Sequence, residues 1–233
     1  MTGRLPSPQP SPASAQSHGG SRVGFRLDLA RCVGCGACVL ACRMENRLPP
    51  SVSWRRILQV NRPRIGGDPT YHLSVACHHC LRPPCVEACP SGALGKRPDG
   101  LVLLDAGRCV GCRYCEMACP FGAPAFDAQA GVMGKCHLCH ERLAEDLAPA
   151  CAAGCPTGAL GFVSREGGGA REDDGDMEHK VVEAARELPG FRDPAGAGPS
   201  FWVVFPGGAR RTRWFRELKA LMGLASDESD ASA

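Results

Sequence analysis

The sequence places 16 cysteines in four groups of four, and their spacing limits the possible fold more than any other feature. Groups one and three share the spacing C-x2-C-x2-C-x3-C, while group two reads C-x2-C-x4-C-x3-C and group four C-x2-C-x11-C-x3-C. The pattern is an internal repeat whose loops differ in length. In chain order the groups are Cys32, Cys35, Cys38 and Cys42; Cys77, Cys80, Cys85 and Cys89; Cys109, Cys112, Cys115 and Cys119; and Cys136, Cys139, Cys151 and Cys155.

The composition leaves little material for a conventional hydrophobic core. Aromatic residues make up 6% of the 233 residues, while 29 residues are glycine and 20 are proline. Because a folded chain must bury apolar surface, we expect a prosthetic group held by the cysteines to replace part of this core. Lys and Arg number 27 against 24 for Asp and Glu, without a basic cluster, which argues against nucleic acid as a partner.

Sixteen cysteines could instead form disulfides in a secreted protein. The segment 1–22 has no apolar run like that of a signal peptide, and the Arg55–Arg56 and Arg210–Arg211 pairs lie too far along the chain for a twin-arginine signal. Apolar stretches such as 201–205 are far shorter than the ~18 residues that span a bilayer. We therefore expect no signal peptide and no membrane span of its own, and thiols that serve as metal ligands.

The spacing favours iron–sulfur cubes. In C-x2-C-x2-C, three thiolates can converge on three corners of one cube, and glycines such as Gly34 and Gly111 allow the loop to take positive φ. The fourth cysteine, which we expect to start a helix, reaches a neighbouring cube, as in two-cluster ferredoxins. In those proteins proline follows the fourth cysteine. Three of the four groups here match, with Pro90, Pro120 and Pro156.

Zinc is the main alternative metal. The runs 77–80 (Cys-His-His-Cys) and 136–140 (Cys-His-Leu-Cys-His) look superficially like zinc sites. Structural zinc does not explain the spacing C-x2-C-x2-C-x3-C twice over, so we interpret the histidines as bystanders. A non-redox zinc scaffold stays the alternative from another functional class.

Charged and sulfur-containing side chains beside the ligands allow two interpretations. Arg43, Arg113 and Lys135 adjoin ligand cysteines. Each either raises the reduction potential of a cluster, by stabilising its more negative reduced form, or is a solvated surface charge. The methionines near the groups are expected to pack rather than to bind metal. These are Met44, Met117 and Met133.

Short elements are expected around the cysteine loops. Strand-like runs at 25–29, 73–75 and 101–104 precede three of the groups, and each C-x3-C end reads as one or two turns of helix. Towards the end of the chain, the pattern predicts helices at 178–188 and 212–221, with a strand at 201–205 between them.

These elements suggest one main domain with flanking segments. The expected segments are a disordered N-terminal extension (1–22), a four-cluster domain (23–163), a Gly-rich and acidic linker (164–200) and a C-terminal segment for docking a partner (201–233). The stretch 43–76 is an insertion between the first two cysteine groups, long enough for a hairpin near 57–60.

The four groups together resemble the four-cluster iron–sulfur subunits of molybdopterin oxidoreductases, and most closely the iron–sulfur (B) subunits of dimethyl sulfoxide reductases. The resemblance covers roughly residues 23–163. The head before Val23 looks longer than is usual in that family, and the segment after Val163 matches no motif. The segments that carry the resemblance are 53–57 (Ser-Trp-Arg-Arg-Ile), 73–80, 89–93 (Cys-Pro-Ser-Gly-Ala), 109–120 and 122–124 (Gly-Ala-Pro).

The resemblance implies an α+β fold of two tandem bacterial-ferredoxin-like halves, each with two clusters, in which groups one and four are combined and groups two and three lie between them. It implies four [4Fe–4S] clusters, because Cys112 occupies a position that lacks cysteine in some relatives. The implied ligand sets are Cys32, Cys35, Cys38 and Cys155; Cys136, Cys139, Cys151 and Cys42; Cys77, Cys80, Cys85 and Cys119; and Cys109, Cys112, Cys115 and Cys89.

The resemblance also implies a function. The chain is expected to relay electrons between a membrane quinol/quinone anchor subunit and a molybdopterin catalytic subunit. It is not expected to be an enzyme on its own, because thiolates bound to iron are not free nucleophiles. Membrane association would come through the partner, either on the cytoplasmic face or after co-export with the catalytic subunit. The alternatives are the same role in a polysulfide, thiosulfate or tetrathionate reductase or a sulfite dehydrogenase, or a free polyferredoxin.

Overall fold

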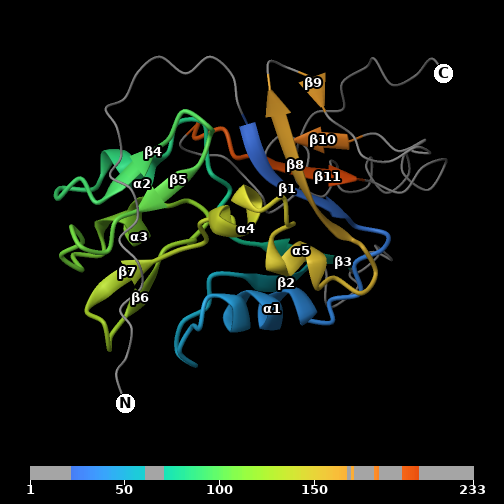
Figure 1. The fold of residues 1–233 in the computed structure, drawn as a ribbon, viewed down its shortest axis with the longest axis horizontal. Coiled ribbons are helices and arrows are strands. Elements are labelled where there is room, and N and C mark those ends of the chain that lie inside the picture. Colours follow the sequence, from blue (N-terminus) through green and yellow to red (C-terminus); the bar gives the residue numbers. More distant parts are fainter. Residues whose placement is uncertain (1–21, 61–70, 167–168, 171–180, 184–195, 205–233) are drawn as a thin grey trace.

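The computed structural model describes residues 22–60, 71–166, 169–170, 181–183 and 196–204 (Figure 1). Five short helices and eleven strands make up the described elements. The helices are α1 (Ala37–Glu45), α2 (Pro84–Glu87), α3 (Tyr114–Ala118), α4 (His140–Ala144) and α5 (Ala150–Ala153). The strands are β1 (Arg22–Asp28), β2 (Arg56–Val60), β3 (Tyr71–Val75), β4 (Leu94–Lys96), β5 (Val102–Leu104), β6 (Ala125–Asp127), β7 (Val132–Gly134), β8 (Leu160–Glu166), β9 (Gly169–Ala170), β10 (Val181–Glu183) and β11 (Phe201–Val204).

One five-stranded sheet joins the two ends of the described chain. Its strand order is β10-β11-β1-β8-β9, with β1 and β11 parallel and the other neighbours antiparallel. The central strand β1 carries Phe25 and Leu27, which are almost completely buried. On β11 the run Phe201–Val204 is buried at every position, as a strand flanked on both edges and covered on both faces requires.

Three antiparallel hairpins complete the sheet structure: β2 with β3, β4 with β5, and β6 with β7. In each case one strand of the hairpin leads into or out of a cysteine loop. β3 ends two residues before Cys77, and β7 ends two residues before Cys136. The hairpins therefore carry the loops that hold the thiols.

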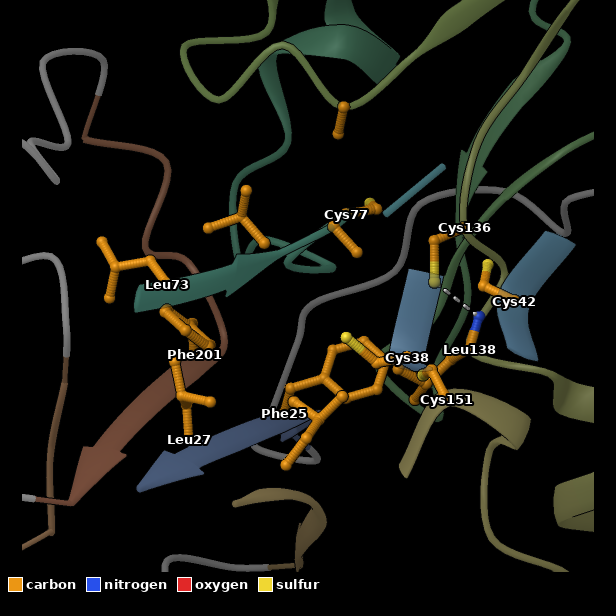
Figure 2. Close-up of a cluster of buried hydrophobic side chains, with 14 of the residues drawn as sticks. Phe25, Leu27, Cys38, Cys42, Leu73, Cys77, Cys136, Leu138, Cys151 and Phe201 are labelled. Carbon is orange, nitrogen blue, oxygen red and sulfur yellow. Dashed lines mark hydrogen bonds between the residues drawn. The ribbon is translucent and has the colours of Figure 1, made fainter. Parts of the chain in front are cut away.

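The hydrophobic core contains the cysteines themselves. One cluster of buried side chains combines Phe25, Leu27, Leu73 and Phe201 with several cysteines (Figure 2). A second, smaller cluster combines Leu94, Val102, Leu104 and Met133 with Cys85 and Cys115. Sulfur thus takes the place that aromatic side chains fill in most cores.

Most of the predicted elements in the region 23–163 are found. The strands at 25–29, 73–75 and 101–104 correspond to β1, β3 and β5, the hairpin near 57–60 is β2 with β3, and the strand at 201–205 is β11. The short helices of the C-x3-C ends are also present. In the described residues no helix has both the length and the apolar character that a bilayer crossing requires.

Three predictions were wrong. The structure has β10 over Val181–Glu183, where the pattern predicted a helix at 178–188, because the two β-branched valines find a pairing partner in β11. The fourth cysteine of groups two, three and four follows a short helix rather than starting one. Met44 and Met117 are 71% and 74% exposed rather than packed, whereas Met133 is buried.

Some predictions concern residues beyond those described. Of the expected disordered extension (1–22), residues 1–21 lie outside the described residues, whereas Arg22 begins β1. The expected helix at 212–221 also lies outside them. Within the expected linker 164–200, β8 continues to Glu166 and β9 pairs with it. Ser200 donates its backbone N–H to His78 O at 2.9 Å, and Ala197 O accepts from the backbone of Arg82, so residues just before β11 contact the second cysteine group.

Candidate metal centres

All 16 cysteines lie in the described part of the chain, and every one is a free thiol. Nine are buried and five are partly buried. Cys35 and Cys112 are exposed. Two equivalent loops, in groups one and three, thus each present one thiol at the surface.

The loops around these two thiols have the backbone that the sequence predicts. Gly34 and Gly111 have φ of 70° and 68°. A Cβ on Gly111 would lie 2.4 Å from the carbonyl oxygen of Gly131, so glycine is required there for close approach as well. Arg113 takes a φ of 66° at the position where group one has Gly36, also left-handed, and each of these residues caps the helix that follows.

Groups one and four come together at one end of the fold. β1 stops shortly before Cys32 and pairs with β8, which begins shortly after Cys155. α1 and α5 pack so closely that a Cβ on Gly154 would lie 3.0 Å from the Cβ of Ala41. One cavity beside these elements is lined by Cys32, Cys35, Cys38 and Cys155.

The second thiol set of this pair is also assembled. The pKa of Cys42 is raised to about 12, chiefly by burial and in part by the nearby thiols of Cys151 and Cys139. Burial also raises the pKa of Cys136, again with Cys151 and Cys42 as neighbours. Figure 2 shows Cys42, Cys136 and Cys151 grouped near Cys38. We call these two thiol sets the outer pair.

Groups two and three form an inner pair in the same manner. β4 follows Cys89 and pairs with β5, which precedes Cys109, and α2 contacts α3. A second cavity is lined by Cys77, Cys80, Cys85 and Cys119. The pKa of Cys85 is raised to about 12, chiefly by burial and in part by the nearby thiols of Cys77 and Cys119.

The last thiol set gathers around Cys115. Burial raises the pKa of Cys115 to about 11, and the adjacent thiols of Cys109, Cys89 and Cys112 contribute to the rise. The structure therefore brings together the thiols of all four implied ligand sets. The assignment of each set to one cube stays a prediction.

Two of the fourth cysteines lie in loops with nearly the same sequence and the same contacts. Residues 89–95 read Cys-Pro-Ser-Gly-Ala-Leu-Gly and residues 155–161 read Cys-Pro-Thr-Gly-Ala-Leu-Gly. Burial alone would raise the pKa of Cys89, but backbone N–H groups, foremost that of Leu94, and the Ser91 hydroxyl outweigh it and lower this pKa. Leu160 and Thr157 do the same for Cys155. These loops are built to stabilise a thiolate.

The sequence did not reveal the importance of one cation, Arg55. Its side chain is 1% exposed and lies among cysteines of the outer pair. Burial would lower its pKa, but the thiols of Cys151, Cys136 and Cys38 raise it overall. The adjacent Arg56 is exposed and donates to the backbone of Phe121 and Gly122. A pair of neighbouring arginines in the sequence gave no sign of which one is buried.

The three cations that the sequence did single out differ from one another. Lys135 is 3% exposed and donates from Nζ to the carbonyl oxygens of Val102 and, at 3.0 Å, Cys136. Arg43 donates to Pro49 O at 3.0 Å, and Arg113 pairs with Glu116 at the surface. Lys135 therefore fits the interpretation as a charge near a cluster, and Arg113 fits the interpretation as a solvated charge.

Three of the histidines that resembled zinc ligands make other contacts. His79 Nδ1 accepts the backbone N–H of Val102 at 3.0 Å, and His78 packs edge-on against Phe121. His137 Nε2 donates to the Asn46 side-chain oxygen at 2.7 Å. Burial lowers the pKa of His78 to about 3 and that of His137 to about 4, so both histidines are held neutral in this fold.

The residues fit iron–sulfur clusters. Burial keeps thiols such as Cys42 and Cys85 protonated unless a cation joins them, and a coordinating thiol is deprotonated outright. In addition, Nε and Nη2 of Arg55 are buried without a hydrogen bond of standard geometry in the described chain, as expected where a negative group belongs. When bound, a [4Fe–4S] cluster supplies exchange of one electron at a time.

Comparisons with known proteins agree with this chemistry. Two patterns of the 4Fe-4S dicluster domain match the chain, one over residues 69–165 and the other over residues 31–93. The chain is 45% identical over 154 residues to the probable anaerobic dimethyl sulfoxide reductase chain YnfG of Escherichia coli (strain K12), a match that covers 61% of this chain and 73% of that relative.

Other relatives serve different substrates. The chain is 42% identical to the thiosulfate reductase electron transfer subunit PhsB of Salmonella typhi, over 58% of this chain and 72% of the relative. It is 36% identical to a sulfite dehydrogenase subunit of Allochromatium vinosum, over 74% and 77% respectively. The described architecture of few helices and short strands agrees with two tandem ferredoxin-like units of α+β type.

The cysteine sets, the two dicluster matches and these relatives have one common explanation. The chain belongs to the iron–sulfur subunits of molybdopterin oxidoreductases, and it transfers electrons through four [4Fe–4S] clusters without being the catalytic subunit.

Proposed function

We propose that this chain relays electrons between a membrane anchor subunit that binds quinol or quinone and a molybdopterin catalytic subunit, as part of a dimethyl sulfoxide reductase-like complex of anaerobic respiration. The chain would be held at the membrane by the anchor subunit. The identity of 45% to a probable dimethyl sulfoxide reductase chain supports this assignment over the others.

The observation that carries the proposal is the position of the two exposed thiols. A relay needs one place where electrons enter and another where they leave. Cys35 and Cys112 belong to different implied cubes, one in the outer pair and one in the inner pair. α1, which follows Cys35, and α3, which follows Cys112, lie in separate parts of the molecule in Figure 1.

Exposed apolar side chains accompany each of these thiols. On the loop and helix that carry Cys35 are Val33, Leu40 and Met44, which are 63%, 60% and 71% exposed. Leu40 and Met44 are four residues apart on α1 and so share one helix face. We call this set the Cys35 patch.

The second set is the Cys112 patch, formed by Val110, Tyr114 and Met117, which are 68%, 53% and 74% exposed. Tyr114 and Met117 lie three residues apart on α3 and also share a face. Exposed apolar side chains gathered on one surface are typical of protein interfaces. Two such patches, one at each exposed thiol, favour two partner subunits.

The protein's own residues hold the clusters and keep water out between these two surfaces. The buried thiols, the apolar side chains of the core and the buried cations Arg55 and Lys135 supply a low-dielectric environment with fixed charges. The catalytic subunit determines the substrate. A thiosulfate, polysulfide or tetrathionate reductase, or a sulfite dehydrogenase, would use the same relay, and two relatives of these types are 42% and 36% identical.

The experiment uses one charged substitution in each patch, Met44→Glu and Met117→Glu. In the anaerobically purified complex, each variant should keep its iron but lose the contact with one partner. One of them should abolish quinol-linked turnover while dye-linked turnover by the catalytic subunit persists. The other should release the catalytic subunit, seen as a loss of molybdenum per chain.

Leu147→Glu is the matched control, since Leu147 is 45% exposed but lies outside both patches. Iron at about sixteen per chain together with about one molybdenum is the expected composition of the intact complex. Full assembly and normal quinol-linked turnover in both patch variants would contradict the proposal. Iron without any molybdenum in the wild-type chain would favour a free polyferredoxin.

A further inference from the structure

Arg55 occupies a position that its surroundings do not explain without the clusters. The guanidinium is buried, and its centre lies 4.1 Å from the centroid of the Phe25 ring. Nη1 donates to the side-chain oxygen of Ser74 at 2.9 Å and to the Ser74 carbonyl oxygen at 3.3 Å. In the part of the chain that the structure describes, no carboxylate pairs with it.

A buried arginine without a carboxylate is costly, because arginine stays protonated and a buried charge requires a partner of opposite sign. The available partners are thiols. Ser74 Oγ lies 3.2 Å from Cys38 Sγ, so one hydroxyl connects the guanidinium to a thiol of the first ligand set. The guanidinium also contacts the thiol of Cys151 and lies near those of Cys42 and Cys136, and these three thiols belong to the second ligand set.

Arg55 therefore lies close to both thiol sets of the outer pair. Cys38 represents one set, and Cys42, Cys136 and Cys151 represent the other; Figure 2 shows these four near one another and near Phe25. The other two guanidinium nitrogens, Nε and Nη2, make no hydrogen bond of standard geometry within the described chain.

We propose that Arg55 is a shared counter-ion for the two outer-pair clusters, positioned by Ser74 and Phe25, and that its charge sets the reduction potentials of both clusters. Ser74 contributes to one of them only, since its hydroxyl reaches Cys38. The inference rests on the implied ligand sets of the outer pair and not on the identity of the partner subunits.

The physical reason is that each reduction adds one negative charge to a cluster already surrounded by thiolates. A fixed positive charge nearby stabilises the reduced form more than the oxidised form and so raises the potential. Because Arg55 is buried, solvent and salt screen this effect little. The same charge acts on both clusters, so its loss should be visible in two signals at once.

The test is a redox titration with chemical mediators, followed by electron paramagnetic resonance, on the anaerobically purified complex. Arg55→Met removes the charge and keeps much of the apolar stem. Both outer-pair clusters should shift to more negative potentials, each by a tenfold change in its reduction equilibrium or more, which is about 59 mV for one electron. Arg55→Lys should retain most of the wild-type potential, and the two inner-pair clusters should not move.

Arg43→Gln is the matched control. Arg43 is next to Cys42 in the sequence, but its guanidinium donates to Pro49 O. It should leave all potentials unchanged. Ser74→Ala should lower the potential of the cluster that includes Cys38 and leave its partner at the wild-type value.

Unchanged potentials in Arg55→Met with full iron content would overturn the proposal. Equal shifts in Arg55→Met and Arg55→Lys would also overturn it, because they would show that packing and not charge sets the potentials. If Arg55→Met loses its outer-pair iron, Arg55→Gln decides, because it also removes the charge but keeps a polar side chain. Lower potentials of both outer-pair clusters in Arg55→Gln support the proposal, and unchanged potentials refute it. The mediators reach the clusters directly, so a chain that fails to exchange electrons with quinol would still give a clear result.

Discussion

Leu27 on β1 lies directly opposite Leu160 on β8, and each stands five residues from a cysteine, Leu27 before Cys32 and Leu160 after Cys155. The strand pairing thus returns the chain from the end of group four to the beginning of group one. It places a thiol from late in the sequence beside three thiols from its start.

The inner pair repeats this relationship. Leu104 on β5 lies five residues before Cys109, Leu94 on β4 lies five residues after Cys89, and the two leucines are paired. A pair of opposed leucines, each five residues from a cysteine, therefore occurs once across a short hairpin and once between strands from the two ends of the four-cluster region. The outer copy depends on a single long-range strand pairing.

Truncation at this pairing should destabilise the outer pair. Leu27 is 0% exposed, and Leu27→Ala should lower the stability of the protein by about 2–5 kcal/mol, the usual cost of removing a buried leucine. Thermal unfolding of the anaerobic protein, followed by loss of visible absorbance, measures the change. Leu147→Ala, at a 45% exposed position, should change stability by less than about 0.5 kcal/mol. Equal effects of the two variants would contradict this role of Leu27.

The ligand sets can be tested pairwise. Cys155→Ser and Cys32→Ser should alter the same cluster signal, because both thiols line one cavity. Cys151→Ser should alter a different signal, together with Cys42→Ser. Electron paramagnetic resonance and iron content of the four variants make the comparison. Coincident changes in Cys155→Ser and Cys151→Ser would show that the assigned sets are wrong.

Clusters should be lost in the order of thiol exposure. In the chain separated from its partner subunits, an oxidant such as ferricyanide should first attack the clusters that include Cys35 and Cys112, the exposed thiols. The cluster bound by Cys42, Cys136, Cys139 and Cys151 should persist longest, since all four of these thiols are buried. Cluster signals recorded over time give the order. Early loss of this buried cluster would disagree with the structure.

Lys135 should tune a cluster of the inner pair. Burial raises the pKa of Cys85, and the charge of Lys135 opposes this rise. Lys135→Gln should therefore lower the reduction potential of the cluster that includes Cys85, by about 59 mV for a tenfold change in the equilibrium.

Arg113→Gln serves as the comparison for Lys135. Arg113 is also next to a ligand cysteine but pairs with Glu116 at the surface, where charges are screened. Mediated redox titration of both variants shows whether only the buried charge of Lys135, and not the surface charge of Arg113, changes a cluster potential. A shift in Arg113→Gln as large as that in Lys135→Gln would show that burial is not what distinguishes them.

The cysteine spacing predicted the metal chemistry, and short apolar runs predicted the strands before the loops. Both predictions succeeded because they depend on residues close in the sequence. The prediction of a helix at 178–188 failed for the opposite reason. Val181–Glu183 pairs with β11, and that partner lies in a distant segment. The local sequence pattern has little influence on whether a segment forms a helix or a strand where a long-range strand pairing is available.

Arg55 and Arg56 show that long-range strand pairing also decides a feature that the local sequence cannot predict in the site. The sequence presents two adjacent arginines, and side chains of neighbouring residues in extended backbone point to opposite sides. Which of the two enters the core depends on how β2 pairs with β3, where Arg56 lies opposite Val75. A shift of this register by one residue would exchange the buried and the exposed arginine.

By itself, the sequence determined that sixteen thiols in four repeated groups bind iron–sulfur clusters, since each loop must bring three thiols together over a few residues. The tertiary structure decided which thiols from distant groups lie near one another, which two thiols reach the surface and which cation is buried beside the outer-pair thiols. Those features follow from the pairing of β1 with β8 and of β2 with β3. Spacing within a loop cannot specify them, because the contacts join residues that are far apart in the chain.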